Sequence, residues 1–216
     1  MIRNLKTKLN HIITMNYFIT AISTDSGKSV ISALLTHALD YAYWKPVQAG
    51  KPTDSDYIRH LVPHAHVYPE TYNLNTPCSP HEAAKIDKIQ IDLNNFKVPQ
   101  SENLIIEGAG GVLVPLNYKG DLMIDLIDQL KAECIVVSNN YLGSINHTLL
   151  TINALQSRGI YIKGIIFNGE ENKATEDIIL KNTQVPFLFR VGTEKEVDDE
   201  FLRKYTPLVK NIFTHE

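Results

Sequence analysis

The sequence predicts a three-layer α/β fold in which a mostly parallel central sheet carries helices on both faces. Short apolar runs typical of buried strands alternate along the chain with segments whose apolar residues recur at helical spacing. Polar residues and glycines follow these runs, as they do at the carboxyl ends of strands that bind ligands. The 216 residues are 44% apolar and 21% charged, which is typical of a globular chain with a large core.

The first half of the chain supplies two strands and two helices. We expect strand, helix, strand and short helix at residues 17–22, 29–39, 42–47 and 54–61. The second of these strands ends in Pro46. The stretch 48–80 is rich in Pro, Asp, Ser, Thr and Tyr, so apart from its short helix we expect it to be mostly loop.

The second half continues the alternation. We expect strands at residues 103–106, 134–137, 160–167 and 186–191, and helices at 122–131, 144–157 and 175–182. Strands that alternate with helices require right-handed crossovers and hence a mostly parallel sheet. Without internal repeats or linkers, residues 15–216 are expected to form a single domain, and residues 1–14 a disordered extension.

Composition argues against several classes of protein. The formal net charge is -3 with no basic excess, which argues against nucleic-acid binding. No apolar run approaches the roughly 20 residues of a membrane-spanning helix. Cys78 and Cys134 lie far apart without a CxxC spacing, so we expect reduced thiols and a cytoplasmic location.

A polar loop at residues 23–29 links the first strand to the first helix and ends in Gly27-Lys28-Ser29. In a P-loop, backbone N–H groups hold phosphates at a helix N-terminus, the lysine contacts the β- and γ-phosphates, and the hydroxyl binds Mg²⁺. The strand–loop–helix context therefore favours a P-loop NTPase type of fold that uses ATP and Mg²⁺. Ile22 stands where the general pattern has its first glycine, so a plain polar turn is the alternative interpretation.

Six blocks, in consistent order from about residue 17 to 191, resemble the dethiobiotin synthetase family. In the loop, Thr24 and Gly27-Lys28-Ser29 agree with the family pattern, whereas residues 21–23 depart from it. The other blocks are KPVQAG (45–50) with SD (55–56), TPCSPHEAA (76–84), EGAGGVLVPL (107–116), LGSINHTLLT (142–151) and FN (167–168).

The resemblance implies a reaction in biotin biosynthesis. The family joins CO2 to 7,8-diaminononanoate and closes a ureido ring to give dethiobiotin, ADP and phosphate. A carbamate and a mixed carbamic-phosphoric anhydride are the intermediates. The resemblance also implies a homodimer, and neither nucleic acid nor membrane is expected as a partner.

The resemblance also assigns site residues. Lys28 and Lys45 are the implied catalytic residues, and Ser29, Asp56 and Glu107 the implied Mg²⁺ ligands. The implied nucleotide-binding residues are Thr24, Asp25, Ser26, Gly27, Lys28, Ser29, Asp56, Glu107, Gly108, Ala109, Gly110 and Asn168. The implied substrate-binding residues are Ala49, Ser79, Gly143, Ser144 and Asn146.

Other interpretations of these residues stay open. Lys45 could be a surface lysine at a strand end, and Asp56 could simply cap the helix that follows it. Glu107 is harder to explain structurally, because a carboxylate that ends an apolar strand needs a cation or hydrogen-bond donors. The alternative function is a P-loop ATPase switch or binding module, although partitioning ATPases carry an extra lysine where Ser23 stands.

Overall fold

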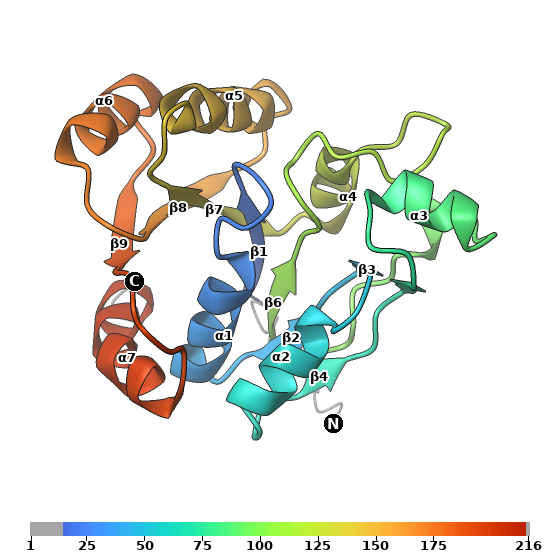
Figure 1. Ribbon diagram of the computed structural model, residues 1–216, viewed down its shortest axis with the longest axis horizontal. Helices are drawn as coiled ribbons and strands as arrows, with labels where there is room; N and C mark the ends of the chain where they lie inside the picture. Colours follow the sequence, from blue (N-terminus) through green and yellow to red (C-terminus); the bar gives the residue numbers. More distant parts are fainter. Residues whose placement is uncertain (1–14, 215–216) are drawn as a thin grey trace, which may run out of the picture.

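A seven-stranded sheet forms the centre of the molecule. The structure is a computed structural model that describes residues 15–214, so the extension expected at 1–14 lies outside the described residues. The strand order is β4-β2-β6-β1-β7-β8-β9, and every pairing is parallel (Figure 1). The strands are β1 (Met15–Ala21), β2 (Ala42–Trp44), β4 (Val67–Tyr68), β6 (Asn103–Glu107), β7 (Glu133–Asn139), β8 (Ile162–Asn168) and β9 (Phe187–Val191).

Helices cover both faces of this sheet, so the predicted three-layer architecture is confirmed. One row, below the sheet in Figure 1, is α1 (Lys28–Leu39), α2 (Asp54–Leu61) and α7 (Asp199–Phe213). The row above is α4 (Met123–Leu130), α5 (Ser144–Ser157) and α6 (Lys173–Thr183). The remaining helices, α3 (Pro80–Ile86) and the 3-10 turn η1 (Leu93–Asn95), lie in the connection between β5 (Tyr72–Leu74) and β6.

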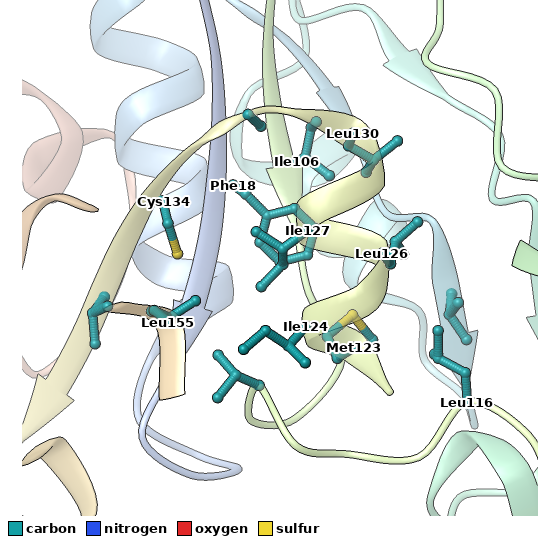
Figure 2. Packing of buried hydrophobic residues seen from close by; sticks show 14 of the residues in the cluster. Phe18, Ile106, Leu116, Met123, Ile124, Leu126, Ile127, Leu130, Cys134 and Leu155 are labelled. Carbon is teal, nitrogen blue, oxygen red and sulfur yellow. The ribbon is translucent and has the colours of Figure 1, made fainter. Parts of the chain in front are cut away.

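Each face of the sheet has its own apolar core, because successive strand residues point to opposite sides. Phe18 packs into the core beneath α4, whereas its neighbours Tyr17 and Ile19 pack into the core beneath α1. Figure 2 shows the first core, where Ile124 and Ile127 of α4 approach Phe18. Burial of each such side chain contributes about 1.5–3 kcal/mol to folding.

A second, smaller sheet stands beside the central one. It pairs β3 (Val47–Ala49) with β5 (Tyr72–Leu74) in parallel, and α3 packs against it. The single strand expected at 42–47 is therefore wrong: the chain leaves the central sheet at Lys45-Pro46. The proline lacks the N–H that would continue the β2 ladder, and strand residues resume in the small sheet.

No helix among residues 15–214 is both long and apolar enough to cross a membrane. Both cysteines are free thiols. Cys78 is exposed, whereas Cys134 lies within the first core, and burial there raises the pKa of its thiol (Figure 2).

Candidate active site

A cleft of about 890 Å³ opens beyond the carboxyl ends of β1, β2 and β6. Loops from both sheets line it, which is where ligands bind in folds of this type. The sequence-predicted residues that line it are Thr24, Asp25, Gly27, Lys28, Ser29, Lys45, Ala49, Ser79, Glu107, Ala109 and Gly110. Most of the predicted site is therefore brought together in one cavity.

The loop between β1 and α1 has the backbone of a phosphate-binding turn. Gly27 has a φ of 92°, a conformation that side chains disfavour, and α1 begins at the next residue. The amide of Asn168, at the end of β8, donates to the Ser26 carbonyl over 3.1 Å. A Cβ on Gly27 would lie 2.0 Å from this amide nitrogen, so glycine is required for the contact.

Lys28 begins α1 and folds its side chain back across the loop. Its ammonium donates to the Ser23 carbonyl over 3.3 Å, and the residue is 8% exposed. Burial, with the nearby charge of Lys45, lowers the pKa of Lys28 below its usual value. Two cations thus face the same cleft, an arrangement that suits a polyanionic ligand.

Glu107 ends β6 and is completely buried among donors. Its Oε1 accepts from the Lys45 ammonium at 2.9 Å and lies 2.9 Å from the Ser29 hydroxyl. Its Oε2 accepts from the Tyr43 hydroxyl at 2.9 Å. These partners account for an ionic group with no exposed surface.

Asp54 completes the cluster from the first turn of α2. Its Oδ2 lies 2.5 Å from the Lys45 ammonium, and its Oδ1 lies 2.9 Å from the Ser29 hydroxyl. The Ser29 proton can serve only one of its two carboxylate neighbours, Asp54 and Glu107, at a time. Lys45 therefore holds the two carboxylates together as the cation between them.

Asp56, the carboxylate assigned from the sequence, does not join this cluster. Its side chain is 61% exposed and pairs with Arg59 at 2.9 Å, and its backbone N–H donates to the Thr53 side chain. Residues two apart on a helix point about 200° apart, so Asp54 and Asp56 cannot face the same cleft. The assignment of Asp56 to the metal site is wrong, and Asp54 stands in the expected place.

The charges of this cluster stabilise each other. Burial pushes the pKa of Lys45 down, but Glu107 and Asp54 more than offset it, so the pKa lies above the usual 10.5. Burial likewise pushes the pKa of Asp54 up, and Lys45 and Ser29 bring it below the usual 3.8. Burial and the neighbouring Glu107 raise the pKa of Tyr43, so its hydroxyl stays protonated.

Three oxygens in the cluster fit a magnesium ion. The hydroxyl of Ser29 lies 2.9 Å from one carboxylate oxygen each of Asp54 and Glu107. Adjacent ligands of an octahedral Mg²⁺ are about 3 Å apart, given metal–oxygen distances of about 2.1 Å. No group of three or more His, Cys, Asp or Glu side chains suited to a metal lies within residues 15–214. Proteins usually bind Mg²⁺ through one or two carboxylates, with phosphates and water as the other ligands, rather than through protein ligands alone. The two carboxylates here fit that pattern.

The small sheet forms the other wall of the cleft. Ala49 and Ser79 line this wall together with Pro77 and Cys78. The Gln48 amide donates to the Gly50 carbonyl at 3.2 Å and its Oε1 accepts from the Asp54 N–H at 3.1 Å. Gln48 therefore ties this wall to the carboxylate cluster.

Comparison with known proteins supplies the family. A family model described as an AAA domain matches residues 15–200. The ATP-dependent dethiobiotin synthetase BioD of Cytophaga hutchinsonii is 53% identical over 88% of this chain and 94% of its own length. The proteins of the same name from Christiangramia forsetii and Rhodopseudomonas palustris are 46% and 42% identical, each over 88% of this chain and 93% and 92% of their own lengths.

This chain belongs to the ATP-dependent dethiobiotin synthetase family. Solved structures with low sequence identity share the fold of this chain. The septum site-determining protein MinD of Pyrococcus horikoshii superposes with a TM-score of 0.59, at 14% identity over 93% of this chain and 96% of MinD. A ParA family ATPase of Chlorobium tepidum superposes with a TM-score of 0.55, at 15% identity over 94% of each chain. This likeness shows the shared fold alone.

Besides Asp56, Ser26 and Gly108, four residues assigned from the family motifs do not line the main cleft. Asn168 lies behind the phosphate loop, where its amide holds Ser26. Gly143, Ser144 and Asn146 lie at the N-terminus of α5. The next turn of α5, with residues 22–24 and 111–114, lines a second hollow of about 410 Å³. The roles of these four residues in ligand binding stay predictions.

Sequence reasoning missed three residues of the candidate site: Asp54, Tyr43 and Gln48. The sequence did contain a signal for Asp54. Thr53 and Asp56 are three residues apart, the spacing of an N-terminal helix cap, so Asp54 is the carboxylate that the cap does not use. No comparable signal marked Tyr43, whose partner is 64 residues away in sequence. Gln48 lay inside a matched block, but its contacts with Gly50 and Asp54 depend on the turn between β3 and α2.

Proposed function

We propose that this chain is a dethiobiotin synthetase that joins CO2 to 7,8-diaminononanoate at the expense of ATP and releases dethiobiotin, ADP and phosphate. The observation that carries the proposal is the convergence of a phosphate loop, two lysines and two carboxylates in one cleft. Family membership supplies the substrates, and the cleft supplies the groups that the reaction needs.

The reaction has three steps. One amine of the diamine attacks CO2 and loses a proton to become a carbamate. A carbamate oxygen then attacks the γ-phosphorus of ATP, ADP leaves, and a carbamic-phosphoric anhydride forms. Finally the second amine attacks the carbamoyl carbon, phosphate leaves, and the five-membered ureido ring closes. Both anionic partners of the second step must be held in line, so catalysis rests on positioning and charge.

The lysines supply the positive charge for the phosphoryl transfer. Lys28 extends from the phosphate loop, and its ammonium neutralises negative charge on the transferring phosphoryl group. Lys45 faces the same cleft from the end of β2 and neutralises the carbamate as it approaches. Since both lysine residues are buried, with 8% and 4% exposure, their charges act through little intervening water.

Ser29, Asp54 and Glu107 would hold the Mg²⁺ ion. The ion would supply charge that neutralises the β- and γ-phosphates of ATP. This assignment keeps Ser29 and Glu107 from the sequence and replaces Asp56 by Asp54, on the distances between their oxygens. Asn168 is proposed to contact adenine from the far side of the loop.

The substrate side uses the wall formed by Ala49 and Ser79 and the N-terminus of α5. Backbone N–H groups in the first turn of α5, those of Ile145 and Asn146, suit the substrate carboxylate. These residues lie outside the main cleft, so we propose that they serve the cleft of a second copy in a homodimer. Exposed apolar side chains surround this region: Leu113, Tyr141, Leu142, Ile145 and Leu150.

Diamine-dependent turnover tests the proposal. Purified protein is incubated with Mg-ATP, bicarbonate and 7,8-diaminononanoate, and phosphate release and dethiobiotin mass are both measured. We expect one phosphate per dethiobiotin and little release without the diamine. Phosphate release that does not depend on the diamine would instead support an ATPase switch, the alternative consistent with the MinD-like fold.

A further inference from the structure

Tyr43 is a buried tyrosine whose hydroxyl contacts the active-site cluster from behind. Its side chain has no exposed surface, and its hydroxyl donates to Glu107 Oε2 over 2.9 Å. It is absent from the lining of the main cleft, so it lies behind the carboxylate rather than beside the substrate. Tyr43 therefore can influence the reaction only through Glu107.

The sheet register explains why a tyrosine reaches this point. Tyr43 of β2 lies opposite Ile105 of β6, and Glu107 follows two residues later on the same face. Two strand residues span about 6.6 Å, which is close to the length of a phenol side chain that leans along the strand. A phenylalanine would fill the same core space and stop short of the carboxylate.

The two oxygens of Glu107 have separate partners. Oε1 faces Ser29 and Lys45 in the cleft, and Oε2 faces Tyr43 in the core. A carboxylate held at only one oxygen can rotate about its last bond, whereas one held at both has a fixed plane. Second partners of this kind orient the groups that bind a metal.

We propose that Tyr43 is a positioning residue that fixes the plane of the Glu107 carboxylate, so that Oε1 stays beside Ser29 and Asp54 for the metal. The inference rests on the proposed function, in which Glu107 holds Mg²⁺. It assigns a role to a hydroxyl that the core does not require.

Tyr17 provides a matched control for Tyr43. Both tyrosines are buried in the same apolar core, with 1% and 0% exposure. The Tyr17 hydroxyl contacts the Met15 sulfur at 3.5 Å, near the start of β1 and at the opposite end of the sheet from the cleft. Tyr17→Phe and Tyr43→Phe thus remove the same atom from the same core, and only one of them touches the cluster.

Metal binding, measured apart from turnover, tests the role. Mn²⁺ is titrated by electron paramagnetic resonance into the complex of each variant with ADP. We expect Tyr43→Phe to weaken Mn²⁺ binding by about tenfold or more, and Tyr17→Phe to leave it within twofold. ADP affinity without metal should be unchanged in both. Equal Mn²⁺ affinities in Tyr43→Phe and wild type, or equal losses in the two variants, would overturn the proposal.

A double-mutant cycle locates the effect on Glu107. In a Glu107→Gln background, Tyr43→Phe should change Mn²⁺ affinity by less than twofold, because the carboxylate that it orients is gone. A loss of Mn²⁺ affinity in that background as large as in the wild-type background would mean that Tyr43 does not act through Glu107, which also overturns the proposal.

If the Tyr43→Phe variant does not fold, a measurement on the wild type still tests the proposal. With tyrosine labelled at Cζ with ¹³C, Mg-ADP should shift one buried tyrosine signal in wild type and not in Glu107→Gln. The absence of such a shift counts against the inference. None of these titrations contains the diamine, so a failure of diamine turnover with normal metal results would refute the proposed function alone.

Discussion

Four charged side chains balance each other inside the cleft: Lys28, Lys45, Asp54 and Glu107. Lys45, Asp54 and Glu107 are each held by a neighbour from another element, so the fold rather than one local segment assembles most of the site. Lys45 and Glu107 have three partners each: Lys45 contacts Asp54, Glu107 and the Gly108 carbonyl, and Glu107 contacts Ser29, Tyr43 and Lys45. Single substitutions here therefore test both chemistry and charge balance.

Lys45→Gln should slow diamine-dependent turnover by about 10²–10³-fold, because the carbamate loses its charged neighbour. Steady-state kinetics checks the turnover, and calorimetry with Mg-ADP checks that nucleotide binding remains. The metal itself can neutralise Asp54 and Glu107 in this variant, so binding should survive. Turnover at the wild-type rate would remove Lys45 from the mechanism.

Asp54→Asn and Asp56→Asn form a matched pair two residues apart. Asp54→Asn should raise the Mg²⁺ concentration for half-maximal activity at least tenfold, because it removes a ligand. Asp56→Asn should change it less than twofold, because an exposed pair with Arg59 is weak. A magnesium titration at fixed ATP measures both, and the reverse order would restore the sequence-based assignment.

The alternation of apolar runs was enough to predict most elements, since α2 and α5 begin and end where their patterns do. The pattern did not predict the elements whose formation depends on tertiary contacts. The small sheet was missed because β3 and β5 are three residues each and gain stability only by pairing. Helix α7 was missed although Phe201, Tyr205 and Val209 have helical spacing, because Pro207 interrupts the pattern.

The phosphate loop offers a test at the level of the turn. Gly27→Ala should abolish tight ADP binding, because its Cβ would meet the Asn168 amide and its φ is positive. Gly120→Ala is the control, since Gly120 also has a positive φ, 103°, but nothing lies within 4 Å of the added carbon. That control should cost about 1–2 kcal/mol of stability and leave ADP affinity intact, as calorimetry and denaturation can show.

Glu176 joins three elements at the far edge of the sheet. It pairs with Arg190 of β9 and accepts from Asn140, which follows β7, and from the Asn172 N–H before α6. Burial pushes the pKa of Glu176 up, but Arg190, Asn172 and Asn140 bring it below the usual 4.5.

Replacement of this carboxylate should therefore have a pH-dependent effect. Glu176→Gln should lower the free energy of unfolding by about 1–3 kcal/mol at neutral pH. A lowered folded-state pKa stabilises the fold above the unfolded value and loses its effect as the pH falls through the folded value. The gap between variant and wild type should thus narrow as the pH falls below about 4.5 and close once the pH has passed the folded-state pKa. A gap in urea denaturation that is constant with pH would contradict this assignment.

Considered as a whole, the molecule has an apolar surface beside the second hollow. Leu142 is fully exposed, and Leu113 and Leu150 are 58% and 57% exposed. Light scattering should give about twice the 24.4 kDa chain mass for wild type. Leu142→Glu with Leu150→Glu should yield monomers that bind Mg-ADP normally but have a diamine KM raised about tenfold or more. Monomers with an unchanged KM would refute a shared substrate site.

The division of the strand at Lys45-Pro46 places the two walls of the cleft on separate β-sheets. The wall proposed to face phosphate belongs to the central sheet, whereas the wall proposed to face the organic substrate rests on β3, β5 and α3. Natural variation or protein engineering can therefore reshape substrate choice through Ala49 and residues 72–86, while Asp54 and the rest of the proposed machinery for splitting ATP are inherited unaltered.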